Sequence, residues 1–400
     1  MGLVQDDHTS LERKGKAAFG SWWTPDSLAT APGRLELLGN HVDYNGGLVL
    51  AGAIDRVIHA MSGPAQSADG SIRLHAPDVQ PGMATVDPSA PSLGDSGSTR
   101  PSDYLAGIIQ ALREASVPVR TGLDIVVSGD VPVGFGMSSS AALCVSLTML
   151  LAETELTSKE IVAIARRAEH ITGAPVGAMD QSASVSGGVI LFDGSTSDIE
   201  RLSPQLGEYV FAVANSGVHH ALGESAYPIR VQESEEALTL MREHTDFDVQ
   251  HLGEIGLDAW RSIEASSESW LSSTLRKRVH HVVSEVDRVR QGVNAVTARD
   301  WVRFGELMTA SGRSSATNYE ISHPVVEELV SRLLEQPGVL GARMMGGGEG
   351  GPALALIHRD SVDDIRDSLE RSFFEPRGLH AEEAFEVCSF GPGAVVRRLT

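Results

Sequence analysis

The sequence has little cysteine, few aromatic residues and a shortage of positive charge. Only Cys144 and Cys388 occur in 400 residues, which excludes a disulfide framework and leaves no cysteine spacing typical of a metal site. The 32 lysines and arginines face 53 aspartates and glutamates, giving a net charge of −21. A field of that sign repels polyanions, so we expect no nucleic acid and no anionic membrane among the partners.

Long apolar runs are missing as well. No segment approaches the length that a membrane-spanning helix requires. The first residues, MGLVQDDHTSLERKG, are too charged for a signal peptide. The sequence therefore predicts a cytoplasmic protein whose partners are small molecules, and it leaves the oligomeric state open with a monomer favoured.

Hydrophobic residues make up 42% of the chain, which is enough for two cores and predicts two lobes. Apolar periodicity indicates helices and strands in alternation, and hence an α+β fold. The expected helices cover residues 103–115, 138–153, 157–173 and much of 225–335, and the expected strands cover 47–63, 122–130 and 209–218. We predict a first lobe over residues 1–205 and a second over 206–400.

The run GFGMSSSAA, Gly134 to Ala142, lies between an expected strand and an expected helix. Backbone N–H groups at a helix start attract anions, and glycine lets the backbone approach a phosphate closely. Serine hydroxyls can add contacts to phosphate oxygens or to a magnesium ion. The alternative is a helix start made of small residues for tight packing. The residues expected to bind phosphate are Gly134, Gly136, Ser138, Ser139 and Ser140.

Other nucleotide-binding patterns do not fit. The chain contains no G-x-x-x-x-G-K-[ST] segment. The triplet His358 to Asp360 lacks the Asn and the D-F-G of a protein kinase, so we interpret it as a surface turn. The run GGGEGG, Gly346 to Gly351, precedes a strand rather than the helix of a dinucleotide-binding fold. It is either a bend beside a ligand or a flexible hairpin.

Two acidic residues flank a glycine-rich turn. Small apolar residues surround Asp180, which predicts a partly desolvated carboxylate in need of a partner, and Arg34 is the candidate. Glu169, at the end of an expected helix, is by itself more typical of a solvated surface charge.

Arg34 belongs to APGRLELLGNHVDYNGG, Ala31 to Gly47, a dense cluster of polar residues between turns. This run resembles the sugar-recognition signature of galactokinases, usually written G-R-x-N-L-I-G-E-H-x-D-Y. Three later runs, VPVGFGMSSSAAL, AEHITGAPVGAMDQ and GARMMGGGEGG, resemble further motifs of the galactose, homoserine, mevalonate and phosphomevalonate (GHMP) kinase superfamily, and NSGVHHALGESAYPIR is similar to its second sugar-contacting stretch. The motifs occur in the family's order along nearly the whole chain.

The resemblance implies a two-lobed GHMP kinase fold with the active site between the lobes. It also implies transfer of the γ-phosphoryl group of ATP to the anomeric hydroxyl of a hexose. Asp180 would take the hydroxyl proton or orient the nucleophile, and Arg34 would hold Asp180 ionised. Ser139 or Ser140 would bind Mg²⁺ together with Glu169. The implied sugar contacts are Asn40, His41, Asp43, Gly177 and Tyr227.

The chain departs from the signature at two positions, because Glu36 and Asn40 stand where galactokinases carry Asn and Glu. In the family that glutamate contacts the hydroxyl at carbon 6. A neutral amide at position 40 would no longer repel an acidic group there. We therefore expect galactose, or alternatively a relative altered at carbon 6 or carbon 2, such as galacturonate or N-acetylgalactosamine. The other interpretation is that the two residues exchanged roles locally. Glu349 is also unusual for the third motif.

Two other functions stay open at the level of sequence. One is a catalytically silent sensor of sugar and ATP, although the SSSAA run, Arg34 and Asp180 are all intact. The other is the same fold acting on mevalonate or homoserine, which would leave the polar cluster at Ala31 to Gly47 without a purpose.

Overall fold

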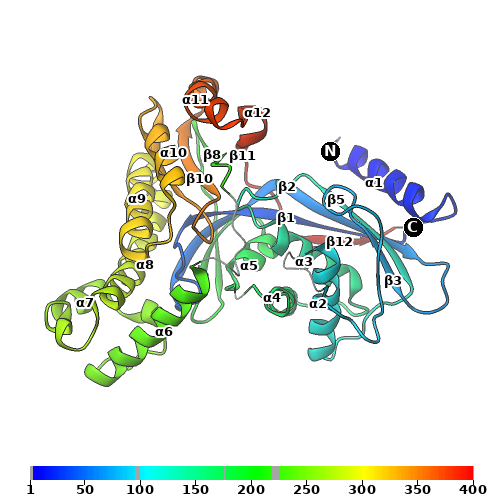
Figure 1. Ribbon diagram of the computed structural model, residues 1–400, viewed down its shortest axis with the longest axis horizontal. Coiled ribbons are helices and arrows are strands. Elements are labelled where there is room, and N and C mark those ends of the chain that lie inside the picture. Colours follow the sequence, from blue (N-terminus) through cyan, green and yellow to red (C-terminus); the bar gives the residue numbers. More distant parts are fainter. Residues whose placement is uncertain (1–2, 95–99, 175, 219–225, 400) are drawn as a thin grey trace.

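The computed structural model describes residues 3–94, 100–174, 176–218 and 226–399, with the side chains of residues 3–7 excepted. Within these ranges two β-sheets form the framework (Figure 1). The first has the order β12-β1-β2-β5-β3-β4, and β6 and β7 extend it from β2. The second has the order β11-β8-β10-β9. All strand pairs are antiparallel except β3 with β5.

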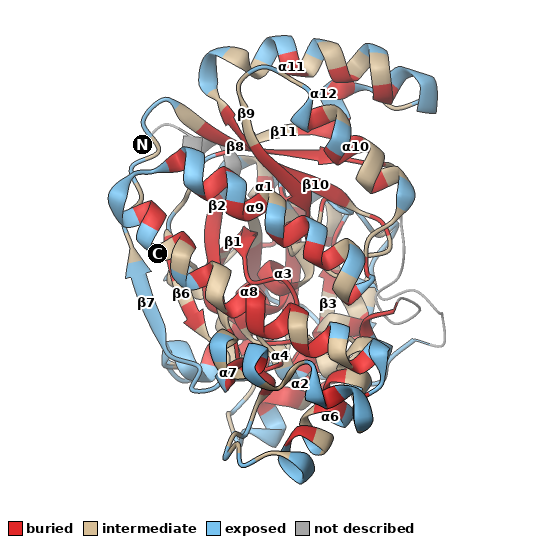
Figure 2. Cartoon of the chain, turned by 90° about the vertical axis from the view of Figure 1, so that its left-hand side faces the viewer, coloured by how far each residue is buried: buried red, intermediate tan, exposed pale blue. Residues whose placement is uncertain are grey.

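The strands of the first sheet are β1 (Ser27–Leu38), β2 (Leu48–Pro64), β3 (Ile72–His75), β4 (Ala84–Val86), β5 (Leu123–Gly129), β6 (Val189–Asp193), β7 (Ile199–Leu202) and β12 (Val395–Arg398). Those of the second are β8 (Tyr209–Asn215), β9 (Val339–Met344), β10 (Pro352–His358) and β11 (Phe385–Cys388). Both sheets are largely buried, whereas exposed residues gather on outlying helices (Figure 2).

The helices that pack near the first sheet are α1 (Leu3–Phe19), α2 (Pro101–Glu114), α3 (Ser139–Leu151), α4 (Ser158–Ile171) and α5 (Met179–Ser186). The later helices are α6 (Tyr227–His244), α7 (Leu257–Ile263), α8 (Ser273–Ala298), α9 (Trp301–Ser314), α10 (Pro324–Leu334), α11 (Val362–Leu369) and α12 (Ala381–Ala384). No helix in the described part of the chain is long and apolar enough to cross a bilayer.

The predicted helices and strands occur at the expected positions, and the α+β fold is confirmed. α4 begins with a capping box, because Thr157 Oγ1 accepts from the Glu160 N–H and Glu160 Oε2 accepts from the Thr157 N–H. The triplet from His358 is a short 3₁₀ turn in which Arg359 and Asp360 are exposed, as the sequence suggests. The N-terminal helix α1 and the small strands β11 and β12 had no counterpart among the sequence predictions.

The two sheets share one apolar core. It joins Leu35 of β1 and Leu50 of β2 to Phe211 of β8 and Leu354 of β10, all at most 1% exposed. β12 returns from the C-terminus to pair with β1 in the first sheet. The predicted lobe boundary at residue 205 falls in the turn between β7, a strand of the first sheet, and β8, a strand of the second. The division into two lobes stays a prediction.

Candidate active site

A cavity of about 290 Å³ lies where β1, the loop before α3, the start of α5 and the β9–β10 loop meet. Every residue predicted to belong to the site lines this cavity, with the exception of Asn40. The lining includes Arg34, His41, Asp43, Gly134, Gly136, Ser138, Ser139, Ser140, Glu169, Gly177, Asp180 and Tyr227. Residues spread over more than 190 positions of the sequence thus converge on one cavity, which identifies it as the candidate site.

Arg34 and Asp180 form the floor of the cavity. Arg34 Nε lies 2.7 Å from Asp180 Oδ1 and Nη2 lies 2.8 Å from Oδ2, a bidentate pair. Arg34 is 5% exposed, so its charge depends on this partner. Its third nitrogen, Nη1, donates to the carbonyl oxygen of Gly136 at 2.5 Å. One arginine therefore ties Asp180 to the loop before α3, and this contact agrees with the pairing expected from the sequence.

The loop before α3 turns tightly through residues of positive φ. Gly134 has φ 83°, Gly136 has φ 58° and Ser138 has φ 55°. The N-terminus of α3 follows at once, and Ser139 and Ser140 face the cavity there. The Ser138 hydroxyl donates to Asp180 Oδ2. Exposed backbone at a helix start, beside three serines, has the geometry of an anion site.

Glu169 of α4 is buried rather than solvated, so the surface interpretation of this residue alone is wrong. It is 3% exposed, and burial raises the pKa of its carboxyl to about 7. Ser140 Oγ donates to Glu169 Oε1 at 2.8 Å, and the Gln181 side chain donates to Oε2. The Glu169 carboxylate and the serine hydroxyls at the start of α3 are oxygen ligands of the kind that Mg²⁺ prefers when phosphates complete its coordination shell. Ser140, rather than Ser139, is the serine that contacts this carboxylate.

His41 lines the opposite end of the cavity, but its ring nitrogens bond to protein. Nε2 lies 3.1 Å from the carbonyl of Gly347 and Nδ1 lies 2.9 Å from the Tyr44 hydroxyl. Burial lowers the pKa of His41 to about 3, so the ring is neutral. A carbonyl can only accept, so Nε2 carries the hydrogen and Nδ1 accepts from Tyr44. His41 thus fixes the glycine-rich loop and the Tyr227 ring, whose centroid is 4.7 Å away, and has no nitrogen left for a sugar hydroxyl.

Asp43 and Gly177 are in direct contact. A Cβ on Gly177 would lie 1.6 Å from Asp43 Oδ2, so only glycine fits beside this carboxylate. Burial, reinforced by the neighbouring carboxylates of Asp180 and Glu36, raises the pKa of Asp43 to about 7. Asp43 therefore offers an acceptor to the cavity whose charge changes near neutral pH.

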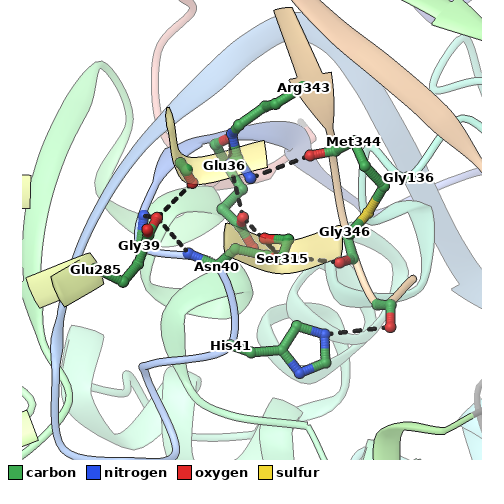
Figure 3. Close-up of polar contacts among 12 residues, drawn as sticks. Glu36, Gly39, Asn40, His41, Gly136, Glu285, Ser315, Arg343, Met344 and Gly346 are labelled. Carbon is green, nitrogen blue, oxygen red and sulfur yellow. Dashed lines mark hydrogen bonds and ion pairs between the residues drawn. The ribbon is translucent and has the colours of Figure 1, made fainter. Parts of the chain in front are cut away.

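Asn40, which is predicted to contact the sugar, does not line the cavity, and that contact stays a prediction. Its side chain is fully buried outside the cavity, where Nδ2 donates to Glu36 Oε1 at 2.9 Å and to the Gly346 carbonyl at 3.1 Å (Figure 3). Its Oδ1 accepts from Ser315 Oγ at 2.9 Å. Glu36, not Asn40, lines the cavity. The sequence could not reveal this, because β1 ends at Leu38 and Asn40 lies in the turn beyond it, where strand alternation no longer decides which side chain faces inward.

The turn that follows β1 is hydrogen-bonded to side chains of α8. Glu285 is fully buried, and its Oε1 accepts from the backbone N–H of Gly39 at 3.0 Å and of Asn40 at 3.3 Å (Figure 3). Burial raises the pKa of the Glu285 carboxyl, but the neighbouring groups together, Arg288 foremost, outweigh burial and lower the pKa to about 2. His281 Nε2 lies 3.0 Å from the carbonyl of Asn40. In the sequence, the sole signal of this contact between α8 and the turn is that Glu285 lies among the apolar residues of one face of the helix.

The glycine run from Gly346 to Gly351 is the β9–β10 connection, and most of it faces the cavity. Both sequence alternatives hold in part, because it is a hairpin loop and also a wall of the site. Glu349, the unusual residue of this run, accepts from the Ala226 N–H at 2.8 Å and so holds the start of α6, which carries Tyr227. Residues 219–225 of the expected second sugar stretch lie outside the described residues.

Comparison with known proteins agrees with this geometry. Residues 103–188 match the GHMP kinases N terminal domain, residues 293–375 match the GHMP kinases C terminal domain, and residues 16–64 match the galactokinase galactose-binding signature. A galactokinase of Canis lupus familiaris is 32% identical, with 90% of this chain and 91% of that protein covered. A galactokinase of Staphylococcus carnosus is 29% identical, with 94% of this chain and 97% of that protein covered.

Among solved structures, the crystal structure of Lactococcus lactis galactokinase complexed with galactose superposes with a TM-score of 0.87 at 29% identity, covering 97% of this chain and 99% of that one. The fold and the paired domains define a GHMP kinase, an enzyme class for which ATP is the phosphoryl donor. Within that class the similarity over nearly the whole length is decisive: the chain belongs to the galactokinase family.

The raised pKa of Asp43 predicts how stability depends on pH. Between the unfolded value near 4 and the folded value of about 7, the folded state holds a proton that the unfolded state has lost. Stability contributed at this site is therefore lost as pH rises from about 4 to about 7, and the loss levels off above that. Asp43→Asn should be more stable than the parent by roughly 4 kcal/mol at pH 8 and by only roughly 1–2 kcal/mol at pH 5. Urea denaturation at both pH values measures this, and an equal difference at the two would contradict it.

Proposed function

We propose that the protein transfers the γ-phosphoryl group of ATP to the anomeric hydroxyl of galactose, giving galactose 1-phosphate and ADP. One observation carries the proposal. The bidentate Arg34–Asp180 pair contacts the loop at the start of α3, through Gly136 and Ser138, and lies close to the Asp43 carboxyl in the same cavity. A carboxylate base paired with a guanidinium, placed where the phosphates of ATP and the hydroxyls of a sugar would meet, suits phosphoryl transfer.

In this reaction Asp180 accepts or orients the proton of the anomeric hydroxyl. The hydroxyl oxygen then forms a bond to the γ-phosphorus, while the bond from that phosphorus to the bridging oxygen breaks and ADP leaves. Arg34 keeps Asp180 in position and neutralises charge near the transferring group. Ser138, whose hydroxyl donates to Asp180, fixes the second carboxylate oxygen. The backbone from Gly134 to Ser140 would cradle the phosphates of ATP.

Mg²⁺ is the metal we propose for this site, with Ser140 and Glu169 as its protein ligands and Ser139 beside them. The ion would neutralise phosphate charge when bound. Glu169 already receives a hydrogen bond from Ser140, so the two oxygens are gathered at one point. The raised pKa of Glu169 fits a carboxyl group whose ionised form a bound cation would stabilise further.

Galactose is favoured over a sugar altered at carbon 6. Galacturonate would be favoured if a neutral amide faced the sugar, but the carboxylate of Glu36 lines the cavity instead. A silent sensor is disfavoured by the intact contacts among Arg34, Asp180 and Ser138. A cytoplasmic location and a monomeric state stay predictions from the sequence.

The proposal is tested by ADP release from ATP and Mg²⁺ with a panel of free sugars: galactose, galactosamine, N-acetylgalactosamine, galacturonate, fucose, arabinose and glucose. We expect the highest kcat/KM with galactose and no turnover without a divalent cation. Absence of ADP release across the panel would refute the kinase function. A clear preference for galacturonate would refute the substrate.

Asp180→Asn tests the catalytic assignment. The amide keeps the size of the side chain but cannot take a proton, and it weakens the pairing with Arg34. Turnover should fall by about 10²–10⁴-fold, while galactose binding measured by calorimetry changes much less. Asp258→Asn, whose side chain is 98% exposed on α7 and lies outside the cavity, is the control that should keep parental turnover. Near-parental turnover in Asp180→Asn would mean that another group is the base.

A further inference from the structure

Glu36 faces the cavity because of its place in β1. Side chains two apart in a strand point to the same face, so Glu36 follows Arg34 into the cavity while Leu35 and Leu37 enter the core between the sheets. Glu36 is 5% exposed and lies on the same wall as Asp43. A nearly buried carboxylate at that position requires a compensating charge.

Arg343 of β9 supplies that charge. Its Nη2 lies 2.7 Å from Glu36 Oε1 and 2.6 Å from the Glu36 carbonyl oxygen, and Nη1 lies 3.1 Å from the Met344 carbonyl (Figure 3). Arg343 is completely buried. The ion pair links β1 of the first sheet to β9 of the second, so it fixes Glu36 against both halves of the site.

Asn40 completes the support of the same carboxylate oxygen. Both hydrogens of its amide are used, one by Glu36 Oε1 and the other by the Gly346 carbonyl. Oε1 thus receives two hydrogen bonds, from Arg343 and from Asn40. The second oxygen, Oε2, accepts no hydrogen bond from the described residues, and the carboxylate lines the cavity. One oxygen anchors the group and the other is available to a ligand.

We propose that Glu36, anchored by Arg343 and Asn40, is a specificity-determining residue that accepts a hydrogen bond from one sugar hydroxyl. It rests on the proposed function, because the ligand must be the sugar acceptor. Together with Asp43 it gives the sugar end of the cavity two carboxylates, which suit a neutral polyol and disfavour an acidic sugar. The exchange of Glu and Asn between positions 36 and 40 thus keeps an acidic contact and supplies it from the strand.

The test compares kcat/KM for galactose with that for 2-deoxy-, 3-deoxy-, 4-deoxy- and 6-deoxygalactose in the parent and in Glu36→Gln. In the parent, removal of the hydroxyl that Glu36 contacts should cost about 10- to 100-fold. In Glu36→Gln that one penalty should shrink to a few-fold, with the other three unchanged. Discrimination against galacturonate should also weaken. Identical penalties in both proteins would overturn the proposal.

Two further variants keep the test decisive. Glu36→Asp retains the charge opposite Arg343 but withdraws the carboxylate from the cavity. It replaces Glu36→Gln in the test if that variant does not fold, and the same deoxy-sugar penalty in kcat/KM should shrink. Glu285→Gln disturbs the same turn from outside the cavity and should change kcat/KM for all five sugars by a common factor. A parent that releases no ADP with galactose would refute the proposed function, whereas an active parent with unchanged ratios would refute only the role of Glu36.

Discussion

The bidentate ion pair between Arg34 and Asp180 is the contact on which the rest of the site depends. The buried charge of Arg34 is tolerated because Asp180, which is partly exposed, satisfies it, and removal of Asp180 would leave that charge uncompensated. The same arginine holds the Gly136 carbonyl, and its own backbone N–H donates to Met137 at 3.0 Å. A single residue of β1 therefore sets the distance between the proposed base and the proposed phosphate loop.

A second constraint acts on the sugar end of the cavity, where the turn after β1 is enclosed by the other sheet and its helices. Glu285 accepts from two backbone N–H groups of that turn, and Arg343 donates to the Glu36 carboxylate. These contacts convert a polar, glycine-bounded loop into a rigid wall. The acidity of Glu36 in that wall follows from the same contacts, since its carboxylate is balanced by Arg343 and Asn40 rather than by solvent.

The sequence predicted local features well and distant partners poorly. Apolar spacing and the Thr157 capping box located α4, and the clustering of small residues around Asp180 indicated a partner for it, because such signals lie within a few residues. The sequence could not indicate that Asn40 lies outside the cavity, because its partners include Ser315 and Gly346, some 275 and 306 residues away. Glu285 and Arg343 were missed for the same reason: a lone charge in an apolar segment does not say what it will meet.

The central claim is that Arg34 and Asp180 act as one unit, and a double-mutant cycle measures this most directly. Single-turnover phosphoryl transfer to galactose would be followed in the parent, in Arg34→Gln, in Asp180→Asn and in the double variant. Residues that work through a shared contact are strongly non-additive. The account predicts that the double variant is no slower than the slower single variant. Rate losses that multiply, as for independent residues, would contradict it.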